Sequence, residues 1–146
     1  MNYLDTSAFV KRFVAEPGSD IVQRLVGTEG PVATATIAYA EVYSGLTRRR
    51  REGGLSVNGY GVACRFEDDW KAVVRVELKD EVLALARDLI RRHPLRGFDA
   101  IHLASALRLQ SDLGLALTFA AADGKLLKAA AAERLAVINV EAPPRL

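Results

Sequence analysis

The stretch Leu115-Ala116-Leu117-Thr118-Phe119 decides the fold class of this chain. It is an uninterrupted, mainly apolar run of strand length, which is typical of a strand that is buried on both faces of a parallel sheet. Gly114 separates it from the helical pattern before it, and a second helical pattern begins at Asp123. A buried strand with a helix on either side predicts a parallel α/β sheet.

The rest of the chain alternates strand and helix patterns in the same way. The other expected strands are 3–4, 32–34 and 137–140, and 73–76 is either a strand or the end of a helix. The expected helices are 8–14, 19–26, 36–51, 55–75, 80–92, 98–110 and 123–135. We therefore predict a single domain over residues 1–146, with three layers (α/β/α) and a mostly parallel central sheet.

The composition is that of an ordinary soluble domain. The chain has 146 residues and a net charge of +2, so no strong field selects a partner. One cysteine, Cys64, excludes an internal disulfide, and with two histidines it is too little for a typical Cys/His zinc site. The N-terminus lacks a signal segment, and the most apolar stretch, 113–122, is too short to cross a bilayer. We expect a cytoplasmic protein with no membrane contact.

Four acidic residues lie at or near the expected carboxyl ends of the strands, where open α/β folds collect their ligands. Asp5 directly follows the first strand, and Asp123 follows the strand that decides the fold. Asp99 begins the helix after residue 97, and Glu41 lies on an apolar face of the long helix before Arg51. The topology should bring these four carboxyl groups toward one edge of the sheet.

Each acid also has a purely structural interpretation. The three aspartates could be helix N-caps, which stabilise by about 1 kcal/mol each. Glu41 could form a buried ion pair with an arginine. Carboxylates that lie together repel each other, however, and a divalent cation removes that conflict. Carboxylate-bound Mg²⁺ or Mn²⁺ can activate a water for attack on phosphorus. Motifs for a phosphate-binding loop, a dinucleotide site, a nucleophilic serine elbow or a zinc protease are absent from the sequence.

Four segments in this order resemble the PIN-domain ribonucleases, and in particular the VapC-type toxins of bacterial toxin–antitoxin pairs. The segments are Leu4-Asp5-Thr6-Ser7-Ala8, Ala38-Tyr39-Ala40-Glu41-Val42, Phe98-Asp99-Ala100-Ile101-His102-Leu103-Ala104 and Ala122-Asp123. Each is weak alone, but four in this order on a chain of this length are specific. The resemblance covers essentially the whole chain.

The resemblance implies a Mg²⁺ or Mn²⁺ site formed by Asp5, Glu41 and Asp99 and completed by Asp123. Thr6, or a water that it holds, would orient Asp5 or a metal-bound water. The implied activity is endonucleolytic cleavage of single-stranded or looped RNA, leaving 3′-hydroxyl and 5′-phosphate ends. The implied partners are a second copy of the chain and a cognate antitoxin, which would pass a C-terminal segment with an arginine across the acidic groove.

One position departs from the family pattern. Family members often carry Ser or Thr two positions before the fourth acid, and this chain has Ala121 there. The departure weakens the assignment of Asp123 and leaves the other three acids unaffected.

Several further residues have two interpretations each. Lys11 is a candidate RNA contact or an ordinary surface residue, and Arg96 could pair with Asp99 or contact the RNA. The run 48–51 is either a phosphate-binding patch or a solvated helix end. His102 could transfer protons, although packing near the site is the favoured interpretation. The aromatic residues Tyr60, Phe66 and Trp70 could stack on unpaired bases, but their helical spacing favours a core or a dimer interface.

The main alternative function is a catalytically silent PIN-like module that binds RNA or a protein partner. It predicts the loss of an essential acid, and all four acids are present. Phosphatases and receiver domains that use an aspartate after the first strand fit poorly, because Ser7 stands where the former need a second aspartate. DNA cleavage as in flap nucleases shares the same acid chemistry, but the short chain favours RNA.

Overall fold

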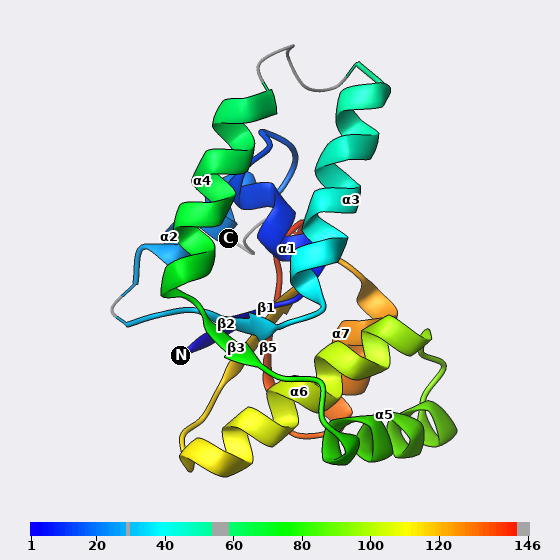
Figure 1. Cartoon of the computed structure of the whole chain (residues 1–146). Helices are drawn as coiled ribbons and strands as arrows, with labels where there is room; N and C mark the ends of the chain where they lie inside the picture. Colours follow the sequence, from blue (N-terminus) through cyan, green and yellow to red (C-terminus); the bar gives the residue numbers. More distant parts are fainter. Residues whose placement is uncertain (29, 54–58, 143–146) are drawn as a thin grey trace.

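The structure is a computed structural model that describes residues 1–28, 30–53 and 59–142, without the side chains of Gly59 and Tyr60. In these residues five parallel strands form one sheet in the order β3-β2-β1-β4-β5 (Figure 1). The strands are β1 (Asn2–Leu4), β2 (Ala33–Ala35), β3 (Val74–Val76), β4 (Thr118–Ala121) and β5 (Ala136–Asn139). The parallel sheet predicted from the sequence is confirmed.

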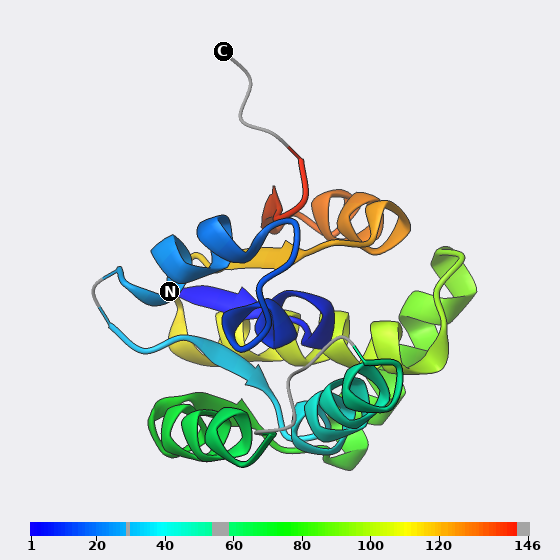
Figure 2. The ribbon, with the colours of Figure 1, turned by 90° about the horizontal axis from the view of Figure 1, so that it is seen from above.

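Helices cover both faces of this sheet (Figure 1). One layer consists of α1 (Thr6–Phe9), the 3₁₀ helix η1 (Val10–Arg12), α2 (Ser19–Val26), α3 (Ala38–Arg51) and α4 (Gly59–Ala72). The other consists of α5 (Asp80–Arg92), α6 (Gly97–Leu113) and α7 (Gly124–Ala132). Figure 2 looks down on the first layer and shows α1 over the middle of the sheet. The three-layer α/β/α architecture is therefore confirmed.

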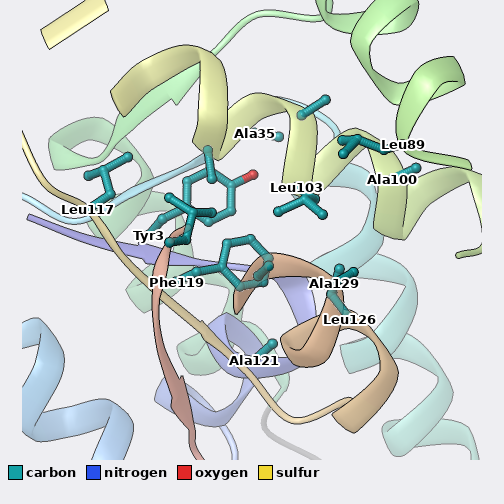
Figure 3. Packing of buried hydrophobic residues seen from close by; sticks show 14 of the residues in the cluster. Tyr3, Ala35, Leu89, Ala100, Leu103, Leu117, Phe119, Ala121, Leu126 and Ala129 are labelled. Atoms are coloured by element: carbon teal, nitrogen blue, oxygen red, sulfur yellow. The ribbon is translucent and has the colours of Figure 1, made fainter. Parts of the chain in front are cut away.

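Two cores lie on opposite sides of the sheet, because successive side chains of a strand point to opposite faces. Tyr3 and Phe119 face α5, α6 and α7, and their rings stack at 5.4 Å (Figure 3). The next residue of each strand, Leu4 or Ala120, faces the opposite core with α1 to α4. All of these side chains are buried.

Phe66 and Trp70 lie in the second core, where their rings pack at 5.7 Å. They therefore do not form a base-stacking surface. Their place in the core agrees with the favoured interpretation of their helical spacing. Tyr60, the third aromatic residue of that prediction, lies outside the described side chains.

The strand β4, which lies between β1 and β5, begins three residues later than the sequence predicts. Leu115 is 61% exposed, and the strand ends with Ala120 and Ala121, both fully buried. Alanine has a low intrinsic preference for strands. Ala120 nevertheless pairs with both β1 and β5, and Ala121 pairs with β5, where small side chains fit between two helical layers. Packing thus overrides propensity in this strand.

The first helix also differs from its prediction, because α1 begins at Thr6 rather than at residue 8; Asp5 caps it, as its structural interpretation predicts. The segment 74–76 is a strand, which resolves the ambiguity there. None of the described helices is long and apolar enough to cross a membrane.

Candidate active site

Asp5 lies at the carboxyl end of β1 and is only 3% exposed. Its Oδ1 accepts hydrogen bonds from the Ala8 backbone N–H at 2.9 Å and from Ser7 Oγ at 2.7 Å. Burial raises the pKa of Asp5, against the opposing effect of His102 and of these hydrogen bonds, and the charge of Asp99 raises it further. A carboxylate in this position is stabilised by a nearby cation.

Ser7 ties Asp5 to the neighbouring strand. Its Oγ accepts a hydrogen bond from the Ala122 backbone N–H at 3.1 Å while it donates to Asp5. Ala121, where the family pattern often has a hydroxyl, is fully buried at the end of β4. Ser7, in the helix that follows β1, therefore places a hydroxyl group at the end of β4. The sequence pattern does not reveal this role.

Glu41 lies in the first turn of α3, and its side-chain partners among the described residues are Thr6 and His102 rather than an arginine. Its Oε1 accepts hydrogen bonds from Thr6 Oγ1 at 2.7 Å and from His102 Nε2 at 2.9 Å. Burial acts to raise the pKa of Glu41, but the hydrogen bonds from His102 and Thr6 outweigh it and lower the pKa below its ordinary value. The arginine ion pair considered for Glu41 is therefore wrong. Thr6 orients Glu41 rather than Asp5.

Asp99 lies in the first turn of α6 and is half-buried. Burial raises its pKa, the charge of Asp123 raises it further, and His102 and Arg96 act in the opposite direction. No side-chain hydrogen bond to Asp99 is formed within the described part of the chain. Its carboxylate is therefore open to a ligand.

Asp123 is exposed and caps α7, as its structural interpretation predicts. Its Oδ1 accepts hydrogen bonds from the backbone N–H groups of Lys125 at 2.8 Å and Leu126 at 3.3 Å. Its charge is close enough to affect the pKa of Asp99. A helix cap and a ligand are compatible, because the cap uses only one carboxylate oxygen.

Two adjoining hollows contain these acids. The larger, of about 870 Å³, is lined by Asp5, Glu41 and Asp99, and we call it the acidic groove. The smaller, of about 620 Å³, is lined by Asp99 and Asp123. Asp99 and Arg96 line both. The structure thus brings three of the predicted acids to one groove and places the fourth in the hollow next to it.

The arrangement of free oxygens fits a hard divalent cation. In Asp5, Glu41 and Asp123 every side-chain hydrogen bond within the described residues ends on one carboxylate oxygen. The second oxygen of each carboxylate accepts no such hydrogen bond and is therefore not fully buried, because no fully buried polar side-chain atom lacks a partner in that part of the chain. Fixed carboxylates with one oxygen open to solvent are the donors that Mg²⁺ and Mn²⁺ take, together with water.

No three Asp, Glu, His or Cys side chains within residues 1–28, 30–53 and 59–142 are close enough to surround a metal ion by themselves. A cation in the acidic groove would therefore keep part of its water shell, as Mg²⁺ commonly does in proteins.

The basic residues around the groove differ in availability. Lys11 is 4% exposed, and its Nζ donates to Glu16 Oε1 at 3.1 Å and to Glu141 Oε1 at 2.8 Å. Its charge is thus neutralised within the protein. Arg96 is exposed and has no ion pair within the part of the chain that the structure describes. Arg48, from the arginine run of α3, also lines the groove.

A parallel sheet that gathers carboxylates at the carboxyl ends of its strands defines an α/β protein with an acidic candidate metal site. The family model of the PIN domain matches residues 3–132, and the chain belongs to the PIN-domain family. The resemblance found in the four sequence motifs is therefore confirmed.

The chain is also similar to VapC ribonucleases of Mycobacterium tuberculosis. It is 40% identical over 114 residues to Ribonuclease VapC45 (strain CDC 1551 / Oshkosh), covering 77% of this chain and 78% of the relative. It is 38% identical over 136 residues to Ribonuclease VapC46 (strain ATCC 25618 / H37Rv), covering 93% and 95%. A toxin–antitoxin complex from Klebsiella pneumoniae shares the fold with a TM-score of 0.67, 16% identity and coverage of 96% and 98%.

Proposed function

We propose that the protein is a metal-dependent endoribonuclease of the VapC type and the toxin of a toxin–antitoxin pair. The observation that carries this proposal is the acidic groove, to which three separate elements each bring one carboxylate. The names of the relatives at about 40% identity support RNA as the substrate.

The positions of the acidic residues suggest which role each has at the proposed metal site. Asp5, Glu41 and Asp99 would hold Mg²⁺ or Mn²⁺, and Asp123 would complete the site from the adjoining hollow. When bound, such an ion lowers the pKa of a water and stabilises the leaving oxygen of the phosphodiester. Hydrolysis then leaves 3′-hydroxyl and 5′-phosphate ends, and no side chain of the protein has to act as nucleophile.

The surroundings of the groove suit an anionic, single-stranded substrate. Arg48 and Arg96 supply positive charge to the phosphates, and Phe98 offers an exposed ring for an unpaired base. Lys11 contributes less, since two carboxylates already bind it.

The same groove would be the target of the cognate antitoxin, with an arginine donating to the acidic carboxylates. We also propose a homodimer that acts in the cytoplasm. The likeness to a known toxin–antitoxin complex over 96% of the chain supports an antitoxin partner.

Purified protein, freed of antitoxin, is expected to cut total cellular RNA into discrete fragments when Mg²⁺ or Mn²⁺ is present. Sequencing of the fragment ends should find 5′-phosphates, and the shared sequence at the ends identifies the target RNA. If folded protein binds RNA but produces no fragments with either metal, the chain is the catalytically silent binding module instead.

Replacement of Phe98 by Ala is expected to raise the KM for RNA by about 5- to 150-fold, because stacking on an aromatic ring contributes about 1–3 kcal/mol per base. Phe98 is 61% exposed, precedes Asp99 and lines the acidic groove. Steady-state cleavage of a short single-stranded RNA measures the effect.

Leu115→Ala is the matched control for Phe98→Ala, since Leu115 is equally exposed but does not line the groove. Equal KM values for the two variants would show that Phe98 does not contact the RNA.

A further inference from the structure

A buried chain of hydrogen bonds leads from the core of the sheet to the acidic groove. Tyr3 OH and His102 Nδ1 lie 2.9 Å apart, and His102 Nε2 lies 2.9 Å from Glu41 Oε1. His102 is 2% exposed, and Tyr3 is fully buried. Both ring nitrogens of His102 are therefore committed to partners inside the protein.

The partners determine where the imidazole carries its proton. A phenol, with an ordinary pKa of about 10, keeps its proton at neutral pH and can donate it to Nδ1. Because a carboxylate oxygen can only accept, the imidazole carries a proton on Nε2 and donates it there, and in the singly protonated ring Nδ1 then accepts from Tyr3. Glu41 Oε1, a carboxylate oxygen, accepts that bond.

Two donors thus converge on one oxygen of Glu41. Thr6 Oγ1 donates to Oε1 at 2.7 Å, and it lies 3.0 Å from His102 Nε2. No described hydrogen bond ends on Oε2, the second oxygen of Glu41. The carboxylate is fixed by one oxygen and open at the other.

We propose that His102 is a positioning residue that holds Glu41 for a divalent cation, and that Tyr3 sets the imidazole tautomer that makes this possible. The inference rests on the proposed function. It also explains why Asp99 and His102 are one helical turn apart: the first turns of α6 supply one acid and the group that orients another.

A packing role for His102 would require only its volume, whereas a positioning role requires an N–H at the place of Nε2. Substitution of His102 by glutamine and by asparagine distinguishes these two roles. Glutamine reaches the place of Nε2 with its own NH₂ group, and asparagine reaches only the place of Nδ1. Both are polar and smaller than the histidine ring, so they perturb the core in similar ways.

The experiment measures Mn²⁺ binding to the RNA-free protein by isothermal titration calorimetry. His102→Asn is expected to bind Mn²⁺ about 10- to 100-fold more weakly than the wild type, the usual effect of losing a group that orients a metal ligand. His102→Gln is expected to stay within about 3-fold of the wild type. The metal concentration that half-saturates RNA cleavage should shift in parallel, with an unchanged KM for RNA.

Gln110→Asn is the matched control. It also shortens a side chain of α6 that holds an internal hydrogen bond, since Gln110 Oε1 accepts from the Leu117 backbone N–H at 2.9 Å, but Gln110 lines neither hollow. Its Mn²⁺ affinity should equal that of the wild type.

Wild-type Mn²⁺ affinity in folded His102→Asn, or equal weakening in both amide variants, would overturn the inference. If neither amide variant folds, Tyr3→Phe decides, because it removes only the hydroxyl: weaker Mn²⁺ binding supports the inference, and unchanged binding overturns it. A wild type that neither binds Mn²⁺ nor cuts RNA would refute the proposed function itself, which is a different result.

Discussion

Asp99→Asn is expected to lower the rate of RNA cleavage by about 10³-fold or more while leaving the fold intact. Asp99 is the acid that lines both hollows, and no described hydrogen bond holds its carboxylate away from a ligand. A bound metal ion supplies several kcal/mol of transition-state stabilisation, and each 1.36 kcal/mol changes the rate tenfold. Single-turnover cleavage at saturating Mg²⁺ measures the loss.

The same substitution is expected to stabilise the metal-free protein at neutral pH. Burial and the charge of Asp123 raise the pKa of Asp99, so the folded state binds a proton there more tightly than the unfolded chain does. Its contribution to stability therefore falls as the pH rises from about 3.9 through the folded pKa, and the penalty is complete above that pKa. Asparagine has no such penalty.

The melting temperature should rise by about 2–4 °C for each kcal/mol of relieved repulsion and burial cost. This advantage of Asp99→Asn should be largest at pH 7 in EDTA and should shrink as the pH is lowered toward 4.

Asp112→Asn is the control on the same helix, because Asp112 is exposed, lies near the far end of α6 and pairs with Arg108. It should retain wild-type cleavage. Cleavage by Asp99→Asn within about tenfold of the wild type would contradict the assignment of Asp99 to the metal site.

Some of the fold can be read directly from sequence periodicity. The helix over 80–92 is predicted with its observed bounds, because Val82, Ala86 and Leu89 repeat on one buried face and Pro94 follows the helix end. The strand β4 is displaced from its prediction because Ala120 and Ala121 carry little strand preference of their own. Their burial depends on the two neighbouring strands, which no local pattern describes.

The candidate site, like the fold, is only partly predictable from the sequence. The types of the four acids and their order along the chain are enough to suggest a metal site from the sequence: Asp5 and Asp123 follow expected strands, and Glu41 and Asp99 lie in expected helices. The hydrogen bonds that orient these acids are different. Glu41 and His102 are 61 residues apart in the sequence, and Tyr3 and His102 are 99 apart. Only the folded chain brings them together, so single-sequence reasoning could place His102 near the site but could not assign its partners.

Removal of divalent metal is expected to abolish cleavage, and Mn²⁺ or Mg²⁺ added beyond the chelator should restore it. Three carboxylates lie around one groove, with a free oxygen on each of Asp5 and Glu41, and in the proposed mechanism a cation held there would activate the water that attacks phosphorus. Titration of total RNA cleavage with EDTA and then with metal checks this. Activity that survives a large excess of EDTA would refute the metal mechanism.

Bound metal should also raise the free energy of unfolding of the wild-type protein, because it offsets the repulsion between the carboxylates. At a free concentration of about 100 times Kd, binding adds about 2.7 kcal/mol, or about 5–10 °C in melting temperature. The melting temperature of Asp99→Asn should be higher than that of the wild type in EDTA and should rise much less with metal, so the order of stability of the two proteins reverses between the metal-free and metal-saturated conditions.

If the wild type shows this thermal shift but cuts no RNA, the acidic groove binds metal without catalysis, and the silent PIN-like module is the better description. If it shows neither shift nor cleavage, the acidic groove does not bind these metals and the proposed function is wrong.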